Sequence, residues 1–343
     1  MGRHRVEQAL LVTEEPVDGG GLDAGRVAHR PDRHSLAAAS GEEPGCGGDD
    51  AVMVAVRGGG VIGHQVLDDI LDSAETIGVI ARDPSRLSMR VRERIEVVQG
   101  AHNDISVVTE AFTGAASVLW LVPPNPHAQN AEDYYLDFGR PACEAIRSQG
   151  VKRVIGVSSL GREFGKNAGL LSPAYVMDDL IESTGVSHRA LRMPFFMENM
   201  LNQVEAIKSK GMILLANSAD RNLSTVATRD IATVAAELLL DDSWSGQSGV
   251  PVVGPDDLSP NDMAKVMSEV LERPVRFQQV PGPDYKTAMM QYGMSEAWAQ
   301  GLADMAEAQN KGVYDAESDT PQSTTPTSFR QWCEEVLRPA VLA

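Results

Sequence analysis

The sequence predicts an α/β fold: a Rossmann-type, doubly wound parallel sheet with a smaller, mainly helical C-terminal lobe. Three observations indicate it. An apolar run at 51–56 leads directly into a glycine-rich turn, and further near-continuous apolar runs follow at 76–80, 95–98, 117–122 and 153–157, with helical patterns between them. Strands that are apolar throughout and alternate with helices are typical of a parallel sheet covered on both faces.

The glycine-rich turn after the first strand indicates a nucleotide site. Gly58, Gly60 and Gly63 fit G-x-G-x-x-G, whose glycines permit a tight turn, a close approach of the backbone to a pyrophosphate, and close packing of helix on strand. Val61 and Ile62 open the following helix, whose first N–H groups suit an anion. Glycine-rich turns also occur without ligands, so the surrounding strand and helix give this motif its meaning.

The later elements continue the alternation and then change character. After the glycine turn, Ile62, Val66 and Leu67 begin a helical stripe, and a short strand is expected at 189–191. Further helices are expected near 104–113, 128–148, 174–184 and along the apolar face from Ile231 to Leu239. A less regular region follows, with a strand at 250–253, an extended segment at 275–280, and helices near 260–271, 283–291 and 295–311.

These patterns predict a division of the chain. Residues 51–195 form an NAD(P)-binding Rossmann core that 225–250 complete, and residues 196–224 and 251–338 form a substrate-capping lobe. Residues 1–50 lack apolar periodicity and are expected to be a disordered extension. Since Met53 stands where a dinucleotide-binding chain would ordinarily begin, a start assigned too far upstream is a working hypothesis.

Composition excludes several classes of function. The 343 residues carry a net charge of −18, which disfavours nucleic acid and anionic membranes as partners, and no run approaches the roughly 20 apolar residues of a membrane helix. The three cysteines and seven histidines form no metal-ligand motif, so no metal is expected. We expect a cytoplasmic monomer or homodimer whose partner is a small-molecule substrate.

Seven short motifs add a family resemblance. They are GGGVIG at 58–63, ARDPSR at 81–86, WLVPP at 120–124, VSSLG at 157–161, LRMPFFMEN at 191–199, TRDIA at 228–232 and ERPV at 272–275. In this order they resemble the NmrA-like branch of the atypical short-chain dehydrogenase/reductases over residues 52–338. The group resembled includes bacterial NAD(P)H-dependent azo-dye, quinone and triphenylmethane reductase-like proteins.

Two positions depart from the family pattern. Arg57 stands where the first glycine of G-x-x-G-x-x-G belongs, and Ala101 replaces an aspartate that often lies near the adenine. The resemblance also implies that Leu121, Val122 and Pro123, which follow the fourth strand, pack along the cofactor. Core packing alone is the other explanation for Leu121.

Arg82 and Arg86 favour NADP over NAD. Arg82 lies 22 residues beyond Gly60, where an acidic residue would bind the NAD ribose and an arginine accommodates the 2′-phosphate of NADP. Arg86 adds a second guanidinium one turn later. A solvated turn in which Asp83 pairs with Arg82 is the other interpretation, and NAD remains the alternative cofactor.

Candidate catalytic residues are few, because no tyrosine is followed by lysine four residues later; Tyr175 is followed by Asp179. We expect Ser158 to be catalytic and Ser159 to orient the substrate, unless both hydroxyls only satisfy the backbone where the strand ends. Phe195 and Phe196 are expected to line an apolar substrate pocket, with core packing as the alternative.

The sequence therefore predicts an NADPH-dependent oxidoreductase that reduces a small, electron-poor conjugated molecule, such as a quinone or azo compound, without a Tyr-x-x-x-Lys pair. Hydride transfer to such an acceptor depends mainly on placement. Two alternatives stay open: an NAD(P)-binding redox-sensing regulator without catalysis, and a tailoring reductase of secondary metabolism.

Overall fold

In this computed structural model the described part of the chain comprises residues 51–55, 61–317 and 324–343. Arg57, Gly58 and Gly60 of the glycine-rich turn lie outside it, as does the extension expected over residues 1–50.

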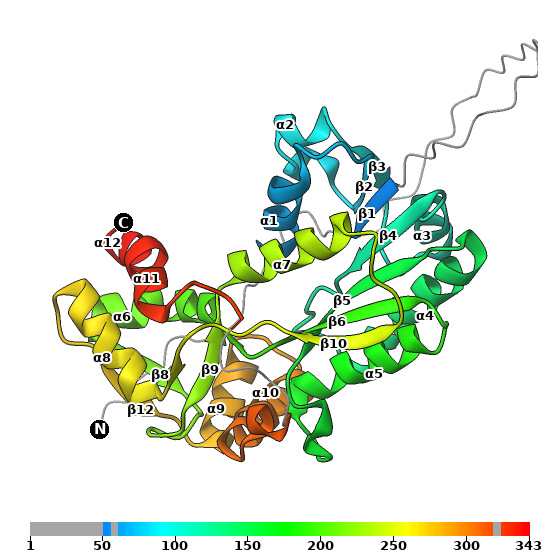
Figure 1. Cartoon of the computed structure of the whole chain (residues 1–343). Helices are drawn as coiled ribbons and strands as arrows, with labels where there is room; N and C mark the ends of the chain where they lie inside the picture. Colours follow the sequence, from blue (N-terminus) through cyan, green and yellow to red (C-terminus); the bar gives the residue numbers. More distant parts are fainter. Residues whose placement is uncertain (1–50, 56–60, 318–323) are drawn as a thin grey trace, which may run out of the picture.

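Seven parallel strands form the main sheet, in the order β10-β6-β5-β4-β1-β2-β3 (Figure 1). The strands are β1 (Ala51–Ala55), β2 (Ile77–Ala81), β3 (Glu96–Gln99), β4 (Ala115–Trp120), β5 (Arg153–Ser159), β6 (Ser187–Met193) and β10 (Gln247–Pro251). The chain winds outward from β1 in one direction and then from β4 in the other. The boundary between β1 and β4 is therefore the switch point, where open α/β sheets place their ligands.

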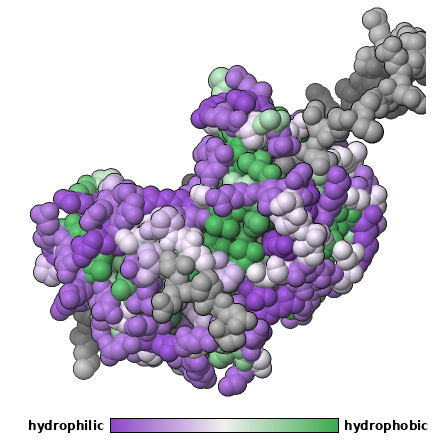
Figure 2. Space-filling view, viewed as in Figure 1, coloured by the Kyte–Doolittle hydropathy of each residue, from purple (hydrophilic) through white to green (hydrophobic). Residues whose placement is uncertain are grey.

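Helices cover both faces of this sheet, as the apolar strands predict. On one face lie α1 (Val61–Ile70) and α7 (Thr228–Leu240), with α2 (Met89–Arg92) at the edge; on the other lie α3 (Ile105–Ala111), α4 (Ala131–Gln149) and α5 (Ser172–Glu182). Ile62, Val66, Leu67 and Ile70 form the buried stripe of α1. Hydrophilic residues cover most of the face seen in Figure 2, and apolar residues show through where α7 lies on the sheet.

The remaining elements form a lobe beside the carboxyl ends of the strands (Figure 1). Its strands are β7 (Phe195–Phe196), β8 (Met212–Leu215), β9 (Leu223–Val226), β11 (Asp257–Leu258) and β12 (Arg276–Gln279), in the small sheets β11-β9-β7 and β12-β8. Its helices are α6 (Val204–Lys210), α8 (Pro260–Leu271), α9 (Gly282–Gln291), α10 (Glu296–Asn310), α11 (Phe329–Trp332) and α12 (Arg338–Leu342).

The Rossmann-type fold predicted from the alternation is confirmed, and one strand differs in its place. The strand expected at 250–253 within the lobe instead lies in the main sheet as β10, where Gln247 to Pro251 pair in parallel with His188 to Arg192 of β6. The apolar run alone could not show this, because a strand's partner depends on the return path of the chain after α7.

Two buried carboxylates fasten the lobe to the sheet. Glu198 accepts hydrogen bonds from the backbone N–H of Thr228 at 3.0 Å and from the indole N–H of Trp332 at 3.1 Å, joining the start of α7 to α11. Glu317 accepts from the backbone of Gly161 at 3.0 Å and from Arg192 at 3.2 Å. Charge-assisted bonds of this kind are among the stronger hydrogen bonds in proteins, so the lobe is held at the strand ends.

The contact of α10 with the turn before α5 depends on Gly169. A Cβ at this position would lie 2.1 Å from the carbonyl oxygen of Gly301 and 2.3 Å from the backbone nitrogen of Met305. We expect Gly169→Ala to destabilise the protein by about 1–3 kcal/mol more than Gly165→Ala, because overpacking adds to the strain of a positive φ. Gly165 is the matched control: its φ is +67°, against +59° at Gly169, but its nearest neighbour would be 3.8 Å away. Thermal unfolding of both variants measures the difference, and equal losses would show that the backbone contact is unimportant.

Candidate active site

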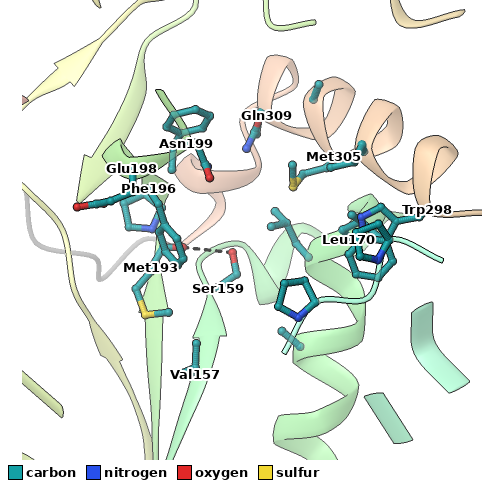
Figure 3. A pocket seen from close by; sticks show the side chains of 18 of the residues that line it. Val157, Ser159, Leu170, Met193, Phe196, Glu198, Asn199, Trp298, Met305 and Gln309 are labelled. Carbon is teal, nitrogen blue, oxygen red and sulfur yellow. Dashed lines mark hydrogen bonds between the residues drawn. The ribbon is translucent and has the colours of Figure 1, made fainter. Parts of the chain in front are cut away.

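A cavity of about 600 Å³ lies between the carboxyl ends of β4, β5 and β6 and the lobe. Figure 3 shows side chains from both sides converging on it, with Val157, Ser159 and Met193 at the strand ends and Trp298, Met305 and Gln309 on α10. Its walls are largely apolar and aromatic. A cavity of this size and character suits a small organic ligand.

Five of the residues predicted to hold a cofactor line this cavity. Val61 and Ile62 line it from the first turn of α1, and Leu121, Val122 and Pro123 line it from the segment after β4. Gly63 lies buried in the same turn of α1. The structure thus brings these segments together at the switch point, with a helix N-terminus beside them.

Arg82 and Arg86 lie apart from the cavity wall. Arg82 is exposed after β2, and Arg86 is exposed in the 3-10 turn Pro84–Arg86. The Asp83 carboxylate accepts from the side chain and backbone of Ser85 at 2.6 and 3.0 Å, and these bonds hold the pKa of Asp83 below its usual value. Since β2 neighbours β1, both arginines follow the strand next to the one that leads into α1.

Ser158 and Ser159 end β5 and both line the cavity, but their hydroxyls differ in partner. The Ser159 hydroxyl can donate to the carbonyl oxygens of Leu160 and Met193, which lie 3.1 and 3.2 Å from its Oγ. Ser158 Oγ lies 2.5 Å from Asp178 Oδ2, on α5 behind the strand. Ser159 therefore fits the alternative of satisfying the backbone, whereas Ser158 links the cavity to a buried acid.

Phe195 and Phe196 follow β6 and both line the cavity. Phe195 also belongs to the apolar core of the lobe, and Phe196 packs against the core beneath α1 and α7. Both phenylalanines therefore line the cavity and also pack in the core, the two roles that the sequence left as alternatives.

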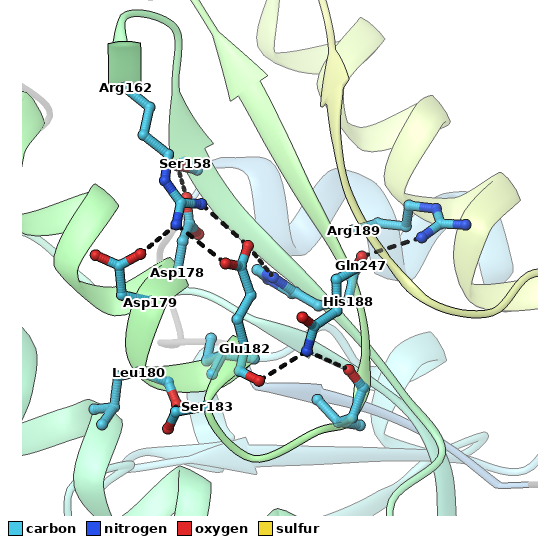
Figure 4. Close-up of polar contacts among 12 residues, drawn as sticks. Ser158, Arg162, Asp178, Asp179, Leu180, Glu182, Ser183, His188, Arg189 and Gln247 are labelled. Atoms are coloured by element: carbon cyan, nitrogen blue, oxygen red, sulfur yellow. Dashed lines mark hydrogen bonds and ion pairs between the residues drawn. The ribbon is translucent and has the colours of Figure 1, made fainter. Parts of the chain in front are cut away.

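Asp178 heads a polar cluster between α5 and β6 that the sequence analysis missed (Figure 4). Arg162 donates to both carboxylate oxygens of Glu182 at 3.0 Å and also pairs with Asp179; His188 Nδ1 lies 3.5 Å from Glu182. Burial raises the pKa of Asp178 to about 7, against the opposing effects of the Ser158 hydrogen bond and of Arg162. Burial also lowers the pKa of His188 to about 4.

Gly156 makes room for this cluster. A Cβ at this position of β5 would lie 2.7 Å from His188 Nε2 and 3.6 Å from Asp178 Oδ1. The sequence did hold a signal for Asp178, because it interrupts the buried apolar stripe of α5 formed by Ala174, Met177 and Ile181. An acid in such a stripe indicates a polar partner in the core.

Two further findings concern the described residues only. None of their His, Cys, Asp and Glu side chains gather in groups of three or more that could hold a metal ion. No helix among them is long and apolar enough to cross a membrane.

An open parallel sheet with a cavity outside its carboxyl ends, at the switch point, defines this chain as a nucleotide-binding type of α/β protein. Comparison with known families makes the assignment more specific. The model of the NmrA-like family matches residues 50–332, and the chain belongs to that family. The resemblance inferred from the seven motifs is confirmed at this level.

Individual relatives are more distant. The chain is 28% identical to (4-alkanoyl-5-oxo-2,5-dihydrofuran-3-yl)methyl phosphate reductase of Streptomyces griseus, over 82% of this chain and 97% of that protein. It is 23% identical to NAD(P)H azoreductase of Xenophilus azovorans, over 74% and 86% of the two chains. The Escherichia coli NADPH-dependent quinone oxidoreductase, solved with NADPH, has the same fold, with a TM-score of 0.69, 20% identity and 83% and 99% coverage.

The raised pKa of Asp178 predicts a pH-dependent effect of Asp178→Asn on stability. A carboxyl whose pKa is higher in the folded state than its ordinary value of 3.8 destabilises the fold increasingly as pH rises from about 4 to about 7. We expect Asp178→Asn to raise the free energy of unfolding at pH 8, on the order of 2 kcal/mol, with the gain vanishing toward pH 4. Chemical denaturation at several pH values measures this, with the exposed neighbour Asp179→Asn as control; a gain that does not vary with pH would contradict the assignment.

Proposed function

We propose that this protein is an NADPH-dependent oxidoreductase that reduces a small, uncharged, electron-poor conjugated molecule by hydride transfer. The observation that carries the proposal is the continuity of the cavity. It runs from the first turn of α1, where a dinucleotide would lie, to the apolar side chains of α9 and α10. A donor and a flat acceptor held in one such space meet the main requirement of the reaction, which is placement.

The described residues fit the cofactor. The N-terminus of α1 suits a diphosphate, Leu121 to Pro123 offer backbone and apolar contact, and Arg82 and Arg86 offer guanidinium groups to a 2′-phosphate. NADPH, when bound, supplies the hydride. The names of the azoreductase and the quinone oxidoreductase, which specify NAD(P)H and NADPH, support this assignment.

The surroundings of Tyr175 argue against a conventional Tyr–Lys mechanism. Its hydroxyl donates to the carbonyl oxygen of Leu160 at 2.6 Å, and burial raises its pKa above the usual value. Asp179, which takes the place of the lysine, is exposed and pairs with Arg162. A hydrogen bond with the Ser159 side chain opposes this rise, but burial dominates, and no lysine stands four residues later to lower the pKa of the tyrosine. We therefore assign the proton to another group.

The cavity wall favours an uncharged acceptor. Glu198 is the one Asp, Glu, Lys or Arg among the described lining residues, and its carboxylate already accepts from Thr228 and Trp332. The indole N–H of Trp298, another lining residue, is buried and makes no hydrogen bond within the described chain. A phosphate group on the acceptor would find no lysine or arginine among the described lining residues.

A screen of acceptors tests the function. NADPH oxidation is followed with quinones, azo dyes and butenolides, the last both as the free alcohol and as the phosphate ester named for the Streptomyces griseus relative. We expect turnover of neutral acceptors and at least about a tenfold lower kcat/KM for the phosphate ester than for its alcohol. Preference for the ester would contradict the neutral-acceptor assignment. NADPH binding without turnover of any acceptor would instead favour the redox-sensing regulator.

Arg82 is expected to determine the choice of cofactor. Removing a guanidinium from a 2′-phosphate site costs a charge-assisted contact, so Arg82→Ala should weaken NADPH binding about tenfold or more and leave NADH binding nearly unchanged. Calorimetry with both cofactors measures the two effects. Arg90→Ala is the control, because Arg90 is an exposed arginine on α2 that pairs with Asp72 at 2.7 Å. Equal weakening of NADPH and NADH by Arg82→Ala would show that this residue does not read the phosphate.

A further inference from the structure

Ser158 stands between the cavity and a buried carboxyl. Its side chain lines the cavity, and its Oγ lies 2.5 Å from Asp178 Oδ2, which belongs to a residue only 1% exposed. One proton is shared along this contact in either of two ways. If Asp178 is ionised, the Ser158 hydroxyl must donate to it, and only oxygen lone pairs face the cavity. If Asp178 is protonated, the carboxyl donates to Ser158, and the serine proton is free to point into the cavity.

We propose that Asp178 sets the direction of the Ser158 hydroxyl, and that its protonated form makes Ser158 the proton donor to the reduced acceptor. This inference rests on the proposed function. It assigns Ser158 as the catalytic residue and Asp178 as the residue that positions and recharges it. A group of this kind supplies what the missing Tyr-x-x-x-Lys pair would otherwise provide.

The groups around Asp178 are balanced in a way that lets both of its forms exist near neutral pH. Arg162, from the turn after β5, and Arg192, on β6, favour the carboxylate, whereas Glu182 on the same helix opposes it. His188 lies on the β6 side over Gly156 and is held neutral by burial, and the Tyr175 hydroxyl is occupied by Leu160. Burial dominates this balance, so the pKa of Asp178 rises to about 7.

The proton and electron count closes without a further reactant. The hydride from NADPH carries two electrons to the acceptor, and the cofactor is left oxidised. The acceptor oxygen or nitrogen then takes the Ser158 proton while Ser158 takes the proton of Asp178. Asp178 is left as a carboxylate and recovers one proton from solvent before the next turnover.

The pH dependence of hydride transfer tests the proposal. Wild-type kcat/KM for a quinone should fall about tenfold per pH unit above pH 7, because the active form needs protonated Asp178. Asp178→Asn should remove this limb: its amide N–H₂ donates to Ser158 at every pH, so the donor direction is fixed. Ser158→Ala should lower the acid plateau about 100-fold and also lose the limb. Asp179→Asn, which changes an exposed neighbour of Asp178, should keep the fall in kcat/KM above pH 7. A limb that persists in Asp178→Asn overturns the proposal.

A second measurement needs neither cofactor nor acceptor. The infrared C=O stretch of a protonated buried carboxyl should be present at pH 5 in the cofactor-free protein, disappear on titration near pH 7, and be absent from Asp178→Asn. Ser158→Ala should shift its frequency, since the carboxyl loses its hydrogen-bond partner. A missing band at pH 5, or a band unaffected by Ser158→Ala, overturns the inference. This result stands even if no acceptor is turned over, so failure of the proposed function and failure of this inference are distinguishable.

Discussion

Seven strands that run in the same direction must end at the same edge, and this constraint positions the groups of the candidate site that the main sheet supplies. The first turn of α1 follows β1, Leu121 follows β4, Ser158 ends β5 and Phe195 follows β6. These residues are far apart in the sequence, yet the parallel ladders bring them to one cavity. Because central strands such as β2, β4 and β5 are buried almost throughout, a slip in register there would disrupt the packing of apolar side chains, and the position of the strand ends is therefore fixed by the core.

The lobe completes the site because it is attached at the same edge. Glu198 belongs to the segment that leaves β7, and it accepts from the first turn of α7 and from α11. Asp230 in turn accepts from the backbone and the hydroxyl of Thr327 at 3.1 and 2.8 Å. These buried acids use their oxygens for structure, which explains how a carboxylate can line an otherwise apolar cavity without making it anionic in function. The space above the strand ends is thereby left to side chains such as Met305 and Trp298.

Local pattern predicted the sheet well and the lobe less well. Apolar runs such as 76–80 and 153–157 predicted β2 and β5 correctly, because a strand buried on both faces can be recognised from its own residues alone. Of the two small sheets, the sequence analysis anticipated β12 alone, as the extended segment at 275–280; strands of two to four residues such as β7 and β9 carry too little periodicity to be recognised. Val61, Leu121 and Ser158 were predicted at the site and do line the cavity, whereas Asp178 was not predicted. Its position in the apolar stripe of α5 indicated a polar partner, but the identity of that partner, Ser158, depends on the packing of α5 against β5.

Asp179 stands where a Tyr-x-x-x-Lys pair would have its lysine, in the helix after β5, and this changes which group of the site can donate a proton. Without a cation beside it, Tyr175 has no reason to ionise, and its hydroxyl instead bonds a backbone carbonyl. The polar side chains of this helix are acids. Asp178 points inward and contacts Ser158, whereas Asp179 and Glu182 pair with Arg162. An inward acid whose pKa is raised to about 7 is partly protonated near neutral pH and can donate a proton, whereas a tyrosine of raised pKa donates poorly. In the proposed mechanism the same helix therefore still places a proton source behind the end of β5, with Ser158 as the group that lines the cavity.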